Sequence, residues 1–358
     1  MISEKMMLTE LMAFSKTDLL NYPILATSDH VKHQLKNIYL AFSKKDLIKI
    51  DRYSWPNAMI ALSLTYGLRH DQLESISVIK VYHDRWIEAG QKINTIDNLM
   101  NGMSLMYLFE KTGDEKYKVA LHKMIAFVIN CMKSFEGSIP YRQKNTESIY
   151  VDAIGILCPF LYRYALIFKD DSIRDLANNQ IFCFIKNGID ELTGLPVHGY
   201  QADTKTKMGI LGWGRGVGWY LCGLADSLEG VEKGSETYLF LSNELIKRLE
   251  LVLKYQYSDG FFGWLLILDR GQCDISATSM ILYAAAKAVA LGLFEYHTLS
   301  VTFERGLTAL QSAYRDGQMS SCSAECGGFS IYPQTYGSYP WGNAPTIAFL
   351  ALLEDIKI

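Results

Sequence analysis

Two aspartates stand at the beginning of apolar segments and could act together as a general acid and a general base. Asp97 precedes the apolar run of residues 98–109, and Asp152 precedes the run of residues 153–162. Two carboxyl groups that share a site suit general acid–base catalysis, because burial and the charge of one group raise the pKa of the other toward neutral pH. Either aspartate could instead only cap a helix, since Asp is a favoured residue at helix N-termini.

A glycine-rich segment supplies the second group of candidates. Glycine occupies every other position from Gly212 to Gly218, and Trp213, Arg215 and Trp219 stand within or directly after the series. Each glycine in a helix costs roughly 0.5–1 kcal/mol relative to alanine, so helix stability does not explain the pattern. The indoles offer flat apolar faces that could stack on a sugar, and the guanidinium is a planar fork suited to a carboxylate. The alternative is a close helix crossing in which the tryptophans fill the core.

These candidates belong to a set of apolar helices that recur along the chain. The first turns of six such helices, roughly 40 to 70 residues apart, are marked by Trp55, Asp97, Asp152, Arg215, Ser276 and Asn343. Return helices are expected at residues 117–133 and 174–186, and leading helices within residues 8–41. Helical hairpins that repeat in this way can close into a ring, because each unit buries its apolar face against its neighbours. The sequence therefore predicts an all-α fold, an (α/α)6 barrel, formed as one catalytic domain by residues 1–358.

In such a barrel the six helix starts lie at one end, so their side chains should surround one cavity. The residues expected there are Trp55, Asp97, Asp152, Arg215, Trp219 and Trp341, with Tyr141, His198 and Tyr200 from loops. His198 is predicted at the tip of a loop of residues 193–201, and Cys326 and residues 332–339 are expected to form the far wall. Aromatic walls with a few acids and a cation indicate a carbohydrate site. No phosphate loop occurs, and no strand is predicted before Gly212 that would complete a dinucleotide fingerprint.

Composition limits the classes of partner. The 358 residues are 49% hydrophobic and 20% charged, with a formal net charge of −3. This balance indicates a compact chain without a general attraction for nucleic acid, so an acidic substrate must be held by a few local cations. No apolar run approaches the ~20 residues of a membrane span. We therefore expect neither nucleic acid nor membrane as a partner, and a monomer or a homodimer.

The cysteines and the first residues bear on location and metal binding. Seven scattered cysteines, an odd number, are typical of reduced core residues in a cytoplasmic protein. The first ten residues contain acidic side chains and no unbroken apolar run, so no secretory signal is recognised. Cys322 and Cys326 form the one close pair, but no matching His or Cys motif lies nearby. We therefore expect a cytoplasmic location, no metal site and no cofactor.

Four segments complete the motif set: residues 151–155, which contain Asp152, residues 198–200, residues 213–219 and residues 342–350. Together they resemble the unsaturated glucuronyl and rhamnogalacturonyl hydrolases, the (α/α)6 glycoside hydrolases of families 88 and 105. The resemblance extends from about Trp55 to the C-terminus, and residues 213–219 are its most specific part. It implies a hydrolase that acts on the terminal 4,5-unsaturated uronic acid left on small oligosaccharides by polysaccharide lyases.

The resemblance also implies roles for individual residues. The aspartate matching Asp152 is the general acid and base in this family, and the one matching Asp97 assists it. The residues matching His198, Arg215 and Trp219 contact the sugar. These roles agree with the chemistry of the side chains, which were selected above by type and position.

Two reactions could use this pair of carboxyl groups. A 4,5-unsaturated uronate is a vinyl ether, so protonation of C4 creates an oxocarbenium-like centre at C5, water adds there, and the hemiketal collapses to release the aglycone. An ordinary inverting glycosidase would place the carboxyl groups ~6.5–9.5 Å apart and activate water at the anomeric carbon. A sugar epimerase or isomerase, which needs more than one inward histidine, and a non-catalytic carbohydrate-binding barrel, which needs neither aspartate, are the remaining alternatives.

Overall fold

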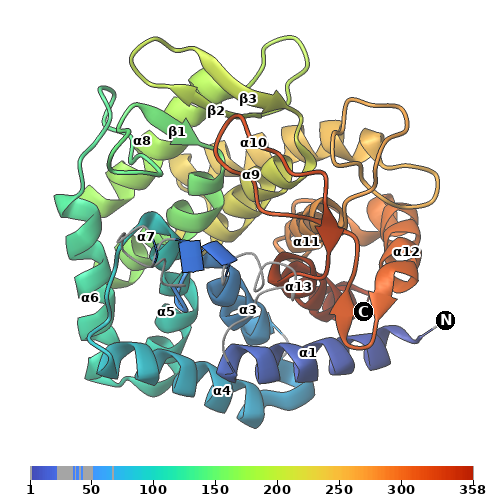
Figure 1. Ribbon diagram of the computed structural model, residues 1–358, viewed down its shortest axis with the longest axis horizontal. Coiled ribbons are helices and arrows are strands. Elements are labelled where there is room, and N and C mark those ends of the chain that lie inside the picture. The colour runs from blue at the N-terminus through green and yellow to red at the C-terminus, as the bar shows by residue number, and fades with distance from the viewer. Residues whose placement is uncertain are drawn as a thin grey trace.

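Six helices form the inner ring of the molecule in a computed structural model, which describes residues 2–21, 51–66 and 68–357 and five positions between residues 35 and 42. The ring consists of α3 (Trp55–Tyr66), α5 (Asn101–Thr112), α7 (Asp152–Phe168), α9 (Gly214–Ser227), α11 (Ile275–Ala290) and α13 (Pro340–Ile356). Each helix packs against the next, and α13 closes the ring by packing against α3 (Figure 1).

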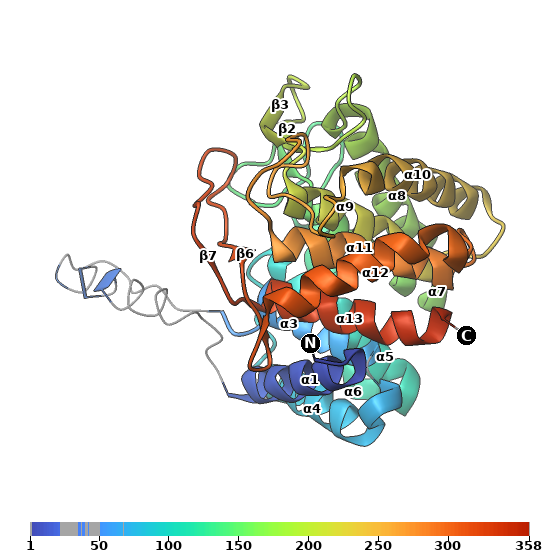
Figure 2. The same ribbon diagram turned by 90° about the vertical axis from the view of Figure 1, so that its right-hand side faces the viewer.

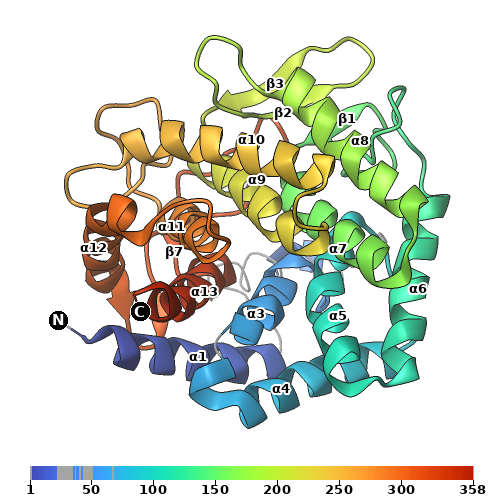
Figure 3. The same ribbon diagram turned by 180° about the vertical axis from the view of Figure 1, so that it is seen from behind.

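A second layer of helices surrounds this ring. It consists of α1 (Glu4–Leu20), α4 (Leu68–Glu88), α6 (Glu115–Asn130), α8 (Asp171–Gly188), α10 (Glu236–Val252) and α12 (Tyr296–Ala313). Each of the outer helices α4, α6, α8, α10 and α12 covers the inner helix that precedes it. The outer helix α1 covers α13, as the view from behind also shows (Figure 3). The predicted (α/α)6 barrel is confirmed. Of the leading helices expected within residues 8–41, α1 is confirmed, and most of the remaining range lies outside the described residues.

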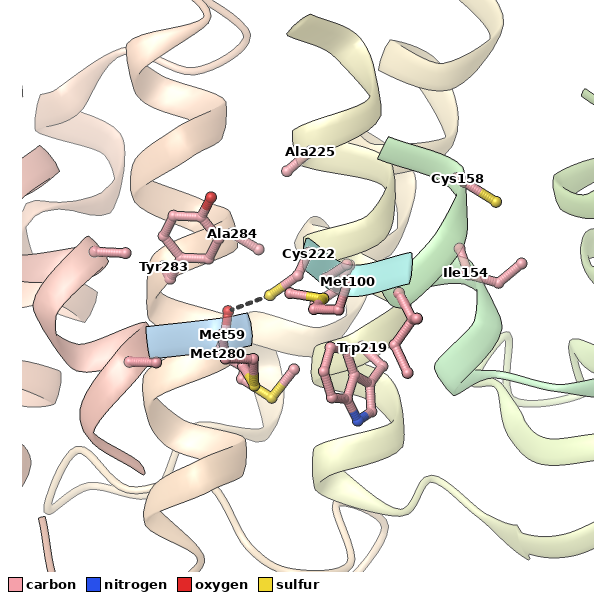
Figure 4. Close-up of a cluster of buried hydrophobic side chains, with 14 of the residues drawn as sticks. Met59, Met100, Ile154, Cys158, Trp219, Cys222, Ala225, Met280, Tyr283 and Ala284 are labelled. Carbon is pink, nitrogen blue, oxygen red and sulfur yellow. Dashed lines mark hydrogen bonds between the residues drawn. The ribbon is translucent and has the colours of Figure 1, made fainter. Parts of the chain in front are cut away.

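Burial explains which helices form the inner ring. Every residue of α9 is buried, as are all of residues 275–288 in α11, and a helix that is apolar on all sides must be enclosed by others. The outer helices bury only one face. Inside the ring, Met59, Met100 and Met280 gather beside Trp219 (Figure 4). Among the described residues, no helix has both the length and the apolar character needed to cross a lipid bilayer.

The glycine series is explained by close packing of α9 against both neighbours. A Cβ added at Gly214 would lie 2.4 Å from the carbonyl oxygen of Gly263, and one at Gly218 would lie 2.7 Å from Cβ of Met280. At Gly223, an added Cβ would meet the backbone of Ile154 in α7 at 2.6 Å. The glycines therefore permit the close helix crossing that was the alternative interpretation of this segment.

Short strands connect the helices at one end of the barrel. β1 (Ser148–Tyr150), β2 (Val197–Gln201) and β3 (Lys207–Leu211) form an antiparallel sheet, while β4 (Tyr314–Arg315) pairs with β5 (Gln318–Met319) and β6 (Cys322–Ser323) with β7 (Tyr336–Gly337). Figure 2 shows β6 and β7 at one end of the helices and the C-terminus at the other.

Two expectations about this end of the barrel are corrected. His198 lies in strand β2 and is 1% exposed, so it is not at the tip of a loop. Strand β3 does precede the glycine segment, although no strand was predicted there. It is the second arm of an antiparallel hairpin, and a dinucleotide site requires a strand of a parallel sheet.

Candidate active site

A cavity with an empty volume of about 470 Å³ opens at the strand-bearing end of the barrel. Its wall consists of Trp55, Tyr141, Arg142, Tyr150, Asp152, His198, Arg215, Trp219, Glu325, Cys326 and Gly328. The residues come from the loops and short strands at this end of the barrel and from the beginnings of α3, α7 and α9. Of the residues predicted for the site, the wall contains Asp152, His198, Arg215, Trp219, Tyr141 and Trp55.

Asp152 presents a buried carboxyl group to this cavity. It is the first residue of α7, and the N-cap is Val151, so Asp152 is not the helix cap. Its Oδ2 lies 3.3 Å from Nε2 of His198, and the side chain is 13% exposed. Within the described part of the chain, this buried Oδ2 takes part in no hydrogen bond of normal geometry. A buried oxygen of this kind requires a proton, a water molecule or a ligand to satisfy it.

His198 is fixed next to Asp152 by its strand and by aromatic neighbours. The carbonyl oxygen of His198 accepts a hydrogen bond of 2.8 Å from the amide of Val151, which joins β2 to the start of α7. The imidazole Nδ1 lies 2.6 Å from the hydroxyl of Tyr332. Its ring centre lies 4.6 Å from that of Trp213 and 5.2 Å from that of Tyr150. The histidine therefore has little freedom to turn away from the carboxyl group.

Asp97 lies directly behind the cavity wall. It occurs in the short helix η1 (Ile96–Met100), whose capping box is formed by Thr95 and Asn98, so Asp97 is not a cap either. Its carboxylate accepts hydrogen bonds from the Tyr141 hydroxyl and from Thr95 Oγ1, the latter at 3.0 Å. Burial, Asp97 and Asp152 hold the pKa of Tyr141 well above its usual value. The Tyr141 hydroxyl thus stays protonated and donates its hydrogen to Asp97.

Two arginines bring positive charge to the cavity. Arg215 is 2% exposed and donates hydrogen bonds to the carbonyl oxygen and hydroxyl of Ser323, at 2.7 and 2.8 Å, and to the carbonyl oxygen of Ala324 at 2.9 Å. These bonds use three of the five N–H groups of the guanidinium. Arg142, which sequence reasoning missed, lies 3.2 Å from Asp97, and about half of its side chain is exposed. Arg142 is therefore the more accessible cation.

Three residues predicted to contact a substrate are not on the wall. Trp213 and Trp341 lie on the guanidinium of Arg215, with ring centres 4.9 and 5.5 Å from its Cζ. The Nε1 of Trp341 donates to the carbonyl oxygen of Ser323 at 2.9 Å. Tyr200 is fully buried, and its hydroxyl donates to Glu136. The two indoles therefore support Arg215 from behind, and Tyr200 packs away from the cavity.

The loop between β6 and β7 adds residues to the cavity wall, and only some of them were predicted from the sequence. Cys326 lies on the far wall as expected, with Sγ 4.0 Å from Nε2 of His198, and Glu325 lies beside it. Burial raises the pKa of the Cys326 thiol to about 12, so this cysteine is a neutral wall residue. Glu325 and Tyr150 carried no sequence signal, because neither begins a helix nor belongs to a recognised motif.

The histidines bear on the epimerase alternative. Among histidines whose side chains the structure describes, only His198 lines the cavity. His83 is bonded to Ser104 and His122 to Tyr164, both between helices. Proton transfer between two inward histidines is therefore not supported by the described part of the chain.

Comparisons of the sequence with known proteins point to one enzyme class. The family model of Glycosyl Hydrolase Family 88 matches residues 29–357. The chain is 22% identical over 317 residues to the unsaturated rhamnogalacturonyl hydrolase YesR of Bacillus subtilis, covering 84% of this chain and 89% of that protein.

Solved structures share the fold. A possible member of the GH105 family from Klebsiella pneumoniae superimposes with a TM-score of 0.84 at 18% identity, covering 98% of this chain and 93% of the other. The unsaturated glucuronyl hydrolase of Bacillus sp. GL1, described as responsible for glycosaminoglycan degradation, superimposes with a TM-score of 0.75 at 15% identity, covering 98% and 97%. At these identities the likeness concerns the fold of the barrel.

Proposed function

The chain belongs to Glycosyl Hydrolase Family 88 and is a glycoside hydrolase, and we propose that it removes a terminal 4,5-unsaturated uronic acid from lyase-generated oligosaccharides. The observation that carries this proposal is the carboxyl group of Asp152, which lines the cavity and has one buried oxygen, Oδ2, that makes no hydrogen bond with the described residues. The unsaturated uronyl substrates named for the relatives support the same class of substrate.

In this reaction Asp152 is the general acid. Its carboxyl group donates a proton to C4 of the unsaturated ring, and the electron pair of the C4–C5 double bond forms the new C–H bond. The ring oxygen stabilises the positive centre at C5, and water adds there while the Asp152 carboxylate accepts a proton from it. The resulting hemiketal collapses and releases the aglycone. Asp97 assists through Tyr141, whose hydroxyl it holds at the cavity wall.

The remaining wall residues suit an acidic sugar. Arg142 and Arg215 are the cations on the wall, and the guanidinium geometry suits a uronate carboxylate. Trp55 and Trp219 also line the cavity and meet edge to face with ring centres 5.6 Å apart, so they add apolar surface to its wall. We propose that these four residues bind the terminal uronate, together with His198.

The direct test is incubation with lyase-generated unsaturated disaccharides while the absorbance of the double bond is followed. We expect the absorbance to fall as the aglycone is released in equal amount. Saturated disaccharides of the same composition are the control. Cleavage of the saturated sugars alone would indicate an ordinary glycosidase, and binding of either sugar without turnover would indicate a carbohydrate-binding barrel.

The setting of the enzyme follows from the same proposal. We propose a small oligosaccharide as the partner, a cytoplasmic location and a single catalytic domain over residues 1–358. All seven cysteines are unpaired, which supports a reducing compartment. Detection of the protein in the cytoplasmic fraction of its source cells would test the location.

A further inference from the structure

The hydroxyl of Tyr332 connects the β6–β7 loop to the imidazole beside Asp152. It lies 2.6 Å from Nδ1 of His198 and accepts a hydrogen bond of 3.2 Å from the backbone amide of Ile210 in β3. Tyr332 is not on the cavity wall. It therefore reaches the site only through His198.

The contact depends on the residue at position 209. A Cβ added at Gly209 would lie 2.6 Å from the Tyr332 hydroxyl and 2.6 Å from Cβ of His198. Gly209 also has a φ of +76°, which side chains rarely adopt. Glycine at this position allows the hydroxyl to sit between the strand and the imidazole.

The hydrogen-bond partners decide the direction of the contact. Ile210 donates to the Tyr332 oxygen, so the single hydroxyl hydrogen needs an acceptor. Among the described residues, Nδ1 of His198 is the one acceptor within hydrogen-bonding distance of this hydroxyl. If Nδ1 carried the imidazole hydrogen instead, the hydroxyl hydrogen would have no partner, which is unfavourable for a half-buried group. Donation from Tyr332 to Nδ1 satisfies both groups.

The tautomer of His198 follows from that direction. A neutral imidazole whose Nδ1 accepts a hydrogen bond carries its hydrogen on Nε2. Nε2 lies 3.3 Å from the buried Oδ2 of Asp152 without hydrogen-bond geometry, and 4.0 Å from Sγ of Cys326, so the N–H group lies beside this oxygen. When Asp152 holds the catalytic proton, the positive end of this N–H dipole beside Oδ2 disfavours a proton on that oxygen and favours it on Oδ1.

We propose that Tyr332 is a positioning residue that fixes the Nε2–H tautomer of His198 and thereby assigns the proton of Asp152 to the oxygen that can reach the substrate. The proposal rests on the proposed function, because it requires Asp152 to be the general acid. Other titratable or charged groups also face this centre, namely Tyr141, Arg142, Tyr150, Arg215, Glu325 and Cys326. They are unchanged in the variants below.

The test compares Tyr332→Phe with a matched control. Tyr164 in α7 places its hydroxyl 2.6 Å from Nδ1 of His122, the same pairing at the same distance. It lies 12 residues after Asp152, about 18 Å along the helix. Tyr164→Phe therefore removes a hydrogen bond of the same type and length away from the cavity, and it shows how much activity is lost through a loss of stability alone.

The first readout is the ¹⁵N NMR spectrum of imidazole-labelled protein at neutral pH, with the His198 signals assigned by their loss in His198→Gln. We expect the Nε2–H tautomer in the wild type and in Tyr164→Phe, and a mixture of tautomers in Tyr332→Phe. An Nδ1–H tautomer in the wild type would overturn the proposal. This readout needs no substrate, so it stands even if the protein proves to cleave another glycoside.

The second readout is the pH profile of turnover. We expect Tyr332→Phe to lower kcat about tenfold with KM within twofold, which is less than the loss of a proton-transfer group itself would cause, because Tyr332 acts through His198. The basic limb of the profile should move to higher pH, because loss of the N–H donor destabilises the Asp152 carboxylate. If Tyr332→Phe and Tyr164→Phe lose equal fractions of kcat and the limbs of both pH profiles stay in place, Tyr332 has only a structural role and the proposal is overturned.

Discussion

Asp97 and Asp226 are two buried aspartates at opposite ends of the barrel, and each accepts hydrogen bonds from tyrosine hydroxyl groups. Asp97 accepts from Tyr141 and lies directly behind the cavity wall. Asp226, in the last turn of α9, accepts from Tyr66 at 3.2 Å and from Tyr283. The space next to Asp226 has an empty volume of about 390 Å³, and its lining is mainly apolar, with Met59, Met100 and Met280 among its residues.

The difference shows that a buried carboxylate bonded to tyrosine does not by itself indicate catalysis. At the mouth, the neighbouring Asp152 has an oxygen that no described residue satisfies, and His198 and two arginines share its cavity. At the opposite end, Asp226 accepts hydrogen bonds from two hydroxyl groups, and Lys287 lies 3.0 Å from the Tyr66 hydroxyl. Tyr66 and Lys287 also line an open pocket with an empty volume of about 970 Å³. A carboxyl group that shares a cavity with a histidine and two arginines can bind and protonate an acidic substrate, whereas the hydrogen bonds around Asp226 hold α3, α9 and α11 together.

The largest expected effect separates the acids of the two ends. Asp152→Asn should lower kcat by about 10³-fold, because the amide cannot donate the catalytic proton. Asp226→Asn should leave kcat within about twofold of the wild type, since Asp226 is not on the wall of the candidate active site. Steady-state turnover of an unsaturated disaccharide measures both. Equal losses in the two variants would remove the distinction between the two ends.

The second effect concerns stability and its dependence on pH. Burial raises the pKa of Asp226 to about 6, so the folded state binds a proton more tightly than the unfolded state does. The stabilisation by the neutral form is complete below about pH 4 and is lost as the pH rises through about 6. At pH 7.5, Asp226→Asn should therefore be more stable than the wild type by up to about 2 kcal/mol. Its tyrosine hydroxyl groups retain an acceptor in the Asn side chain.

Denaturant unfolding at several pH values from 4 to 8 measures this effect. The difference in unfolding free energy between Asp226→Asn and the wild type should be near zero at pH 4 and should grow across pH 4–6. A difference that stays constant over this range would show that Asp226 titrates normally. Comparing the two proteins at each pH cancels the titration of the other carboxyl groups.

A third effect concerns substrate binding by the accessible cation. Arg142→Met should raise KM about tenfold, because a hydrogen bond between charged groups contributes roughly 1.5–3 kcal/mol. The matched control is Arg163→Met. Arg163 lies outside the site and donates two hydrogen bonds, of 2.8 and 2.7 Å, to the carboxylate of Glu110. Initial rates at varied substrate concentration distinguish the two. An unchanged KM in Arg142→Met would assign carboxylate binding to Arg215.

The fold was predictable from the sequence because inner and outer helices differ in burial. The apolar segments beginning near Trp55, Asp152 and Arg215 have few polar positions, and the structure encloses them on all sides. The start residues also indicated one end of the barrel, which is why Asp152, Arg215 and Trp55 were expected around one cavity and are found there.

The side chains that lie behind the cavity wall were not predictable, because the apolar period of a helix does not determine how the loops pack on one another. Trp341 belongs to the correct end but lies on Arg215, and Tyr200 points to Glu136 on the outer side of its sheet. Arg142 and Glu325 follow strands and turns with no helical period. Their positions depend on loops from distant parts of the chain, and tertiary contacts of this kind leave no local signal.

The smallest expected effects come from the tyrosine hydroxyl groups themselves. Tyr141→Phe and Tyr66→Phe each remove one hydroxyl donated to a buried aspartate, so each should lower the unfolding free energy by about 1 kcal/mol. Only Tyr141→Phe should also lower kcat/KM, by about fivefold, because Tyr141 faces both Asp97 and the cavity. Thermal unfolding and turnover, measured on the same samples, separate the two contributions. A loss of kcat/KM in Tyr66→Phe as large as in Tyr141→Phe would mean that the end of the barrel that contains Asp226 is coupled to catalysis through α9, since Asp226 and Trp219 lie on that helix.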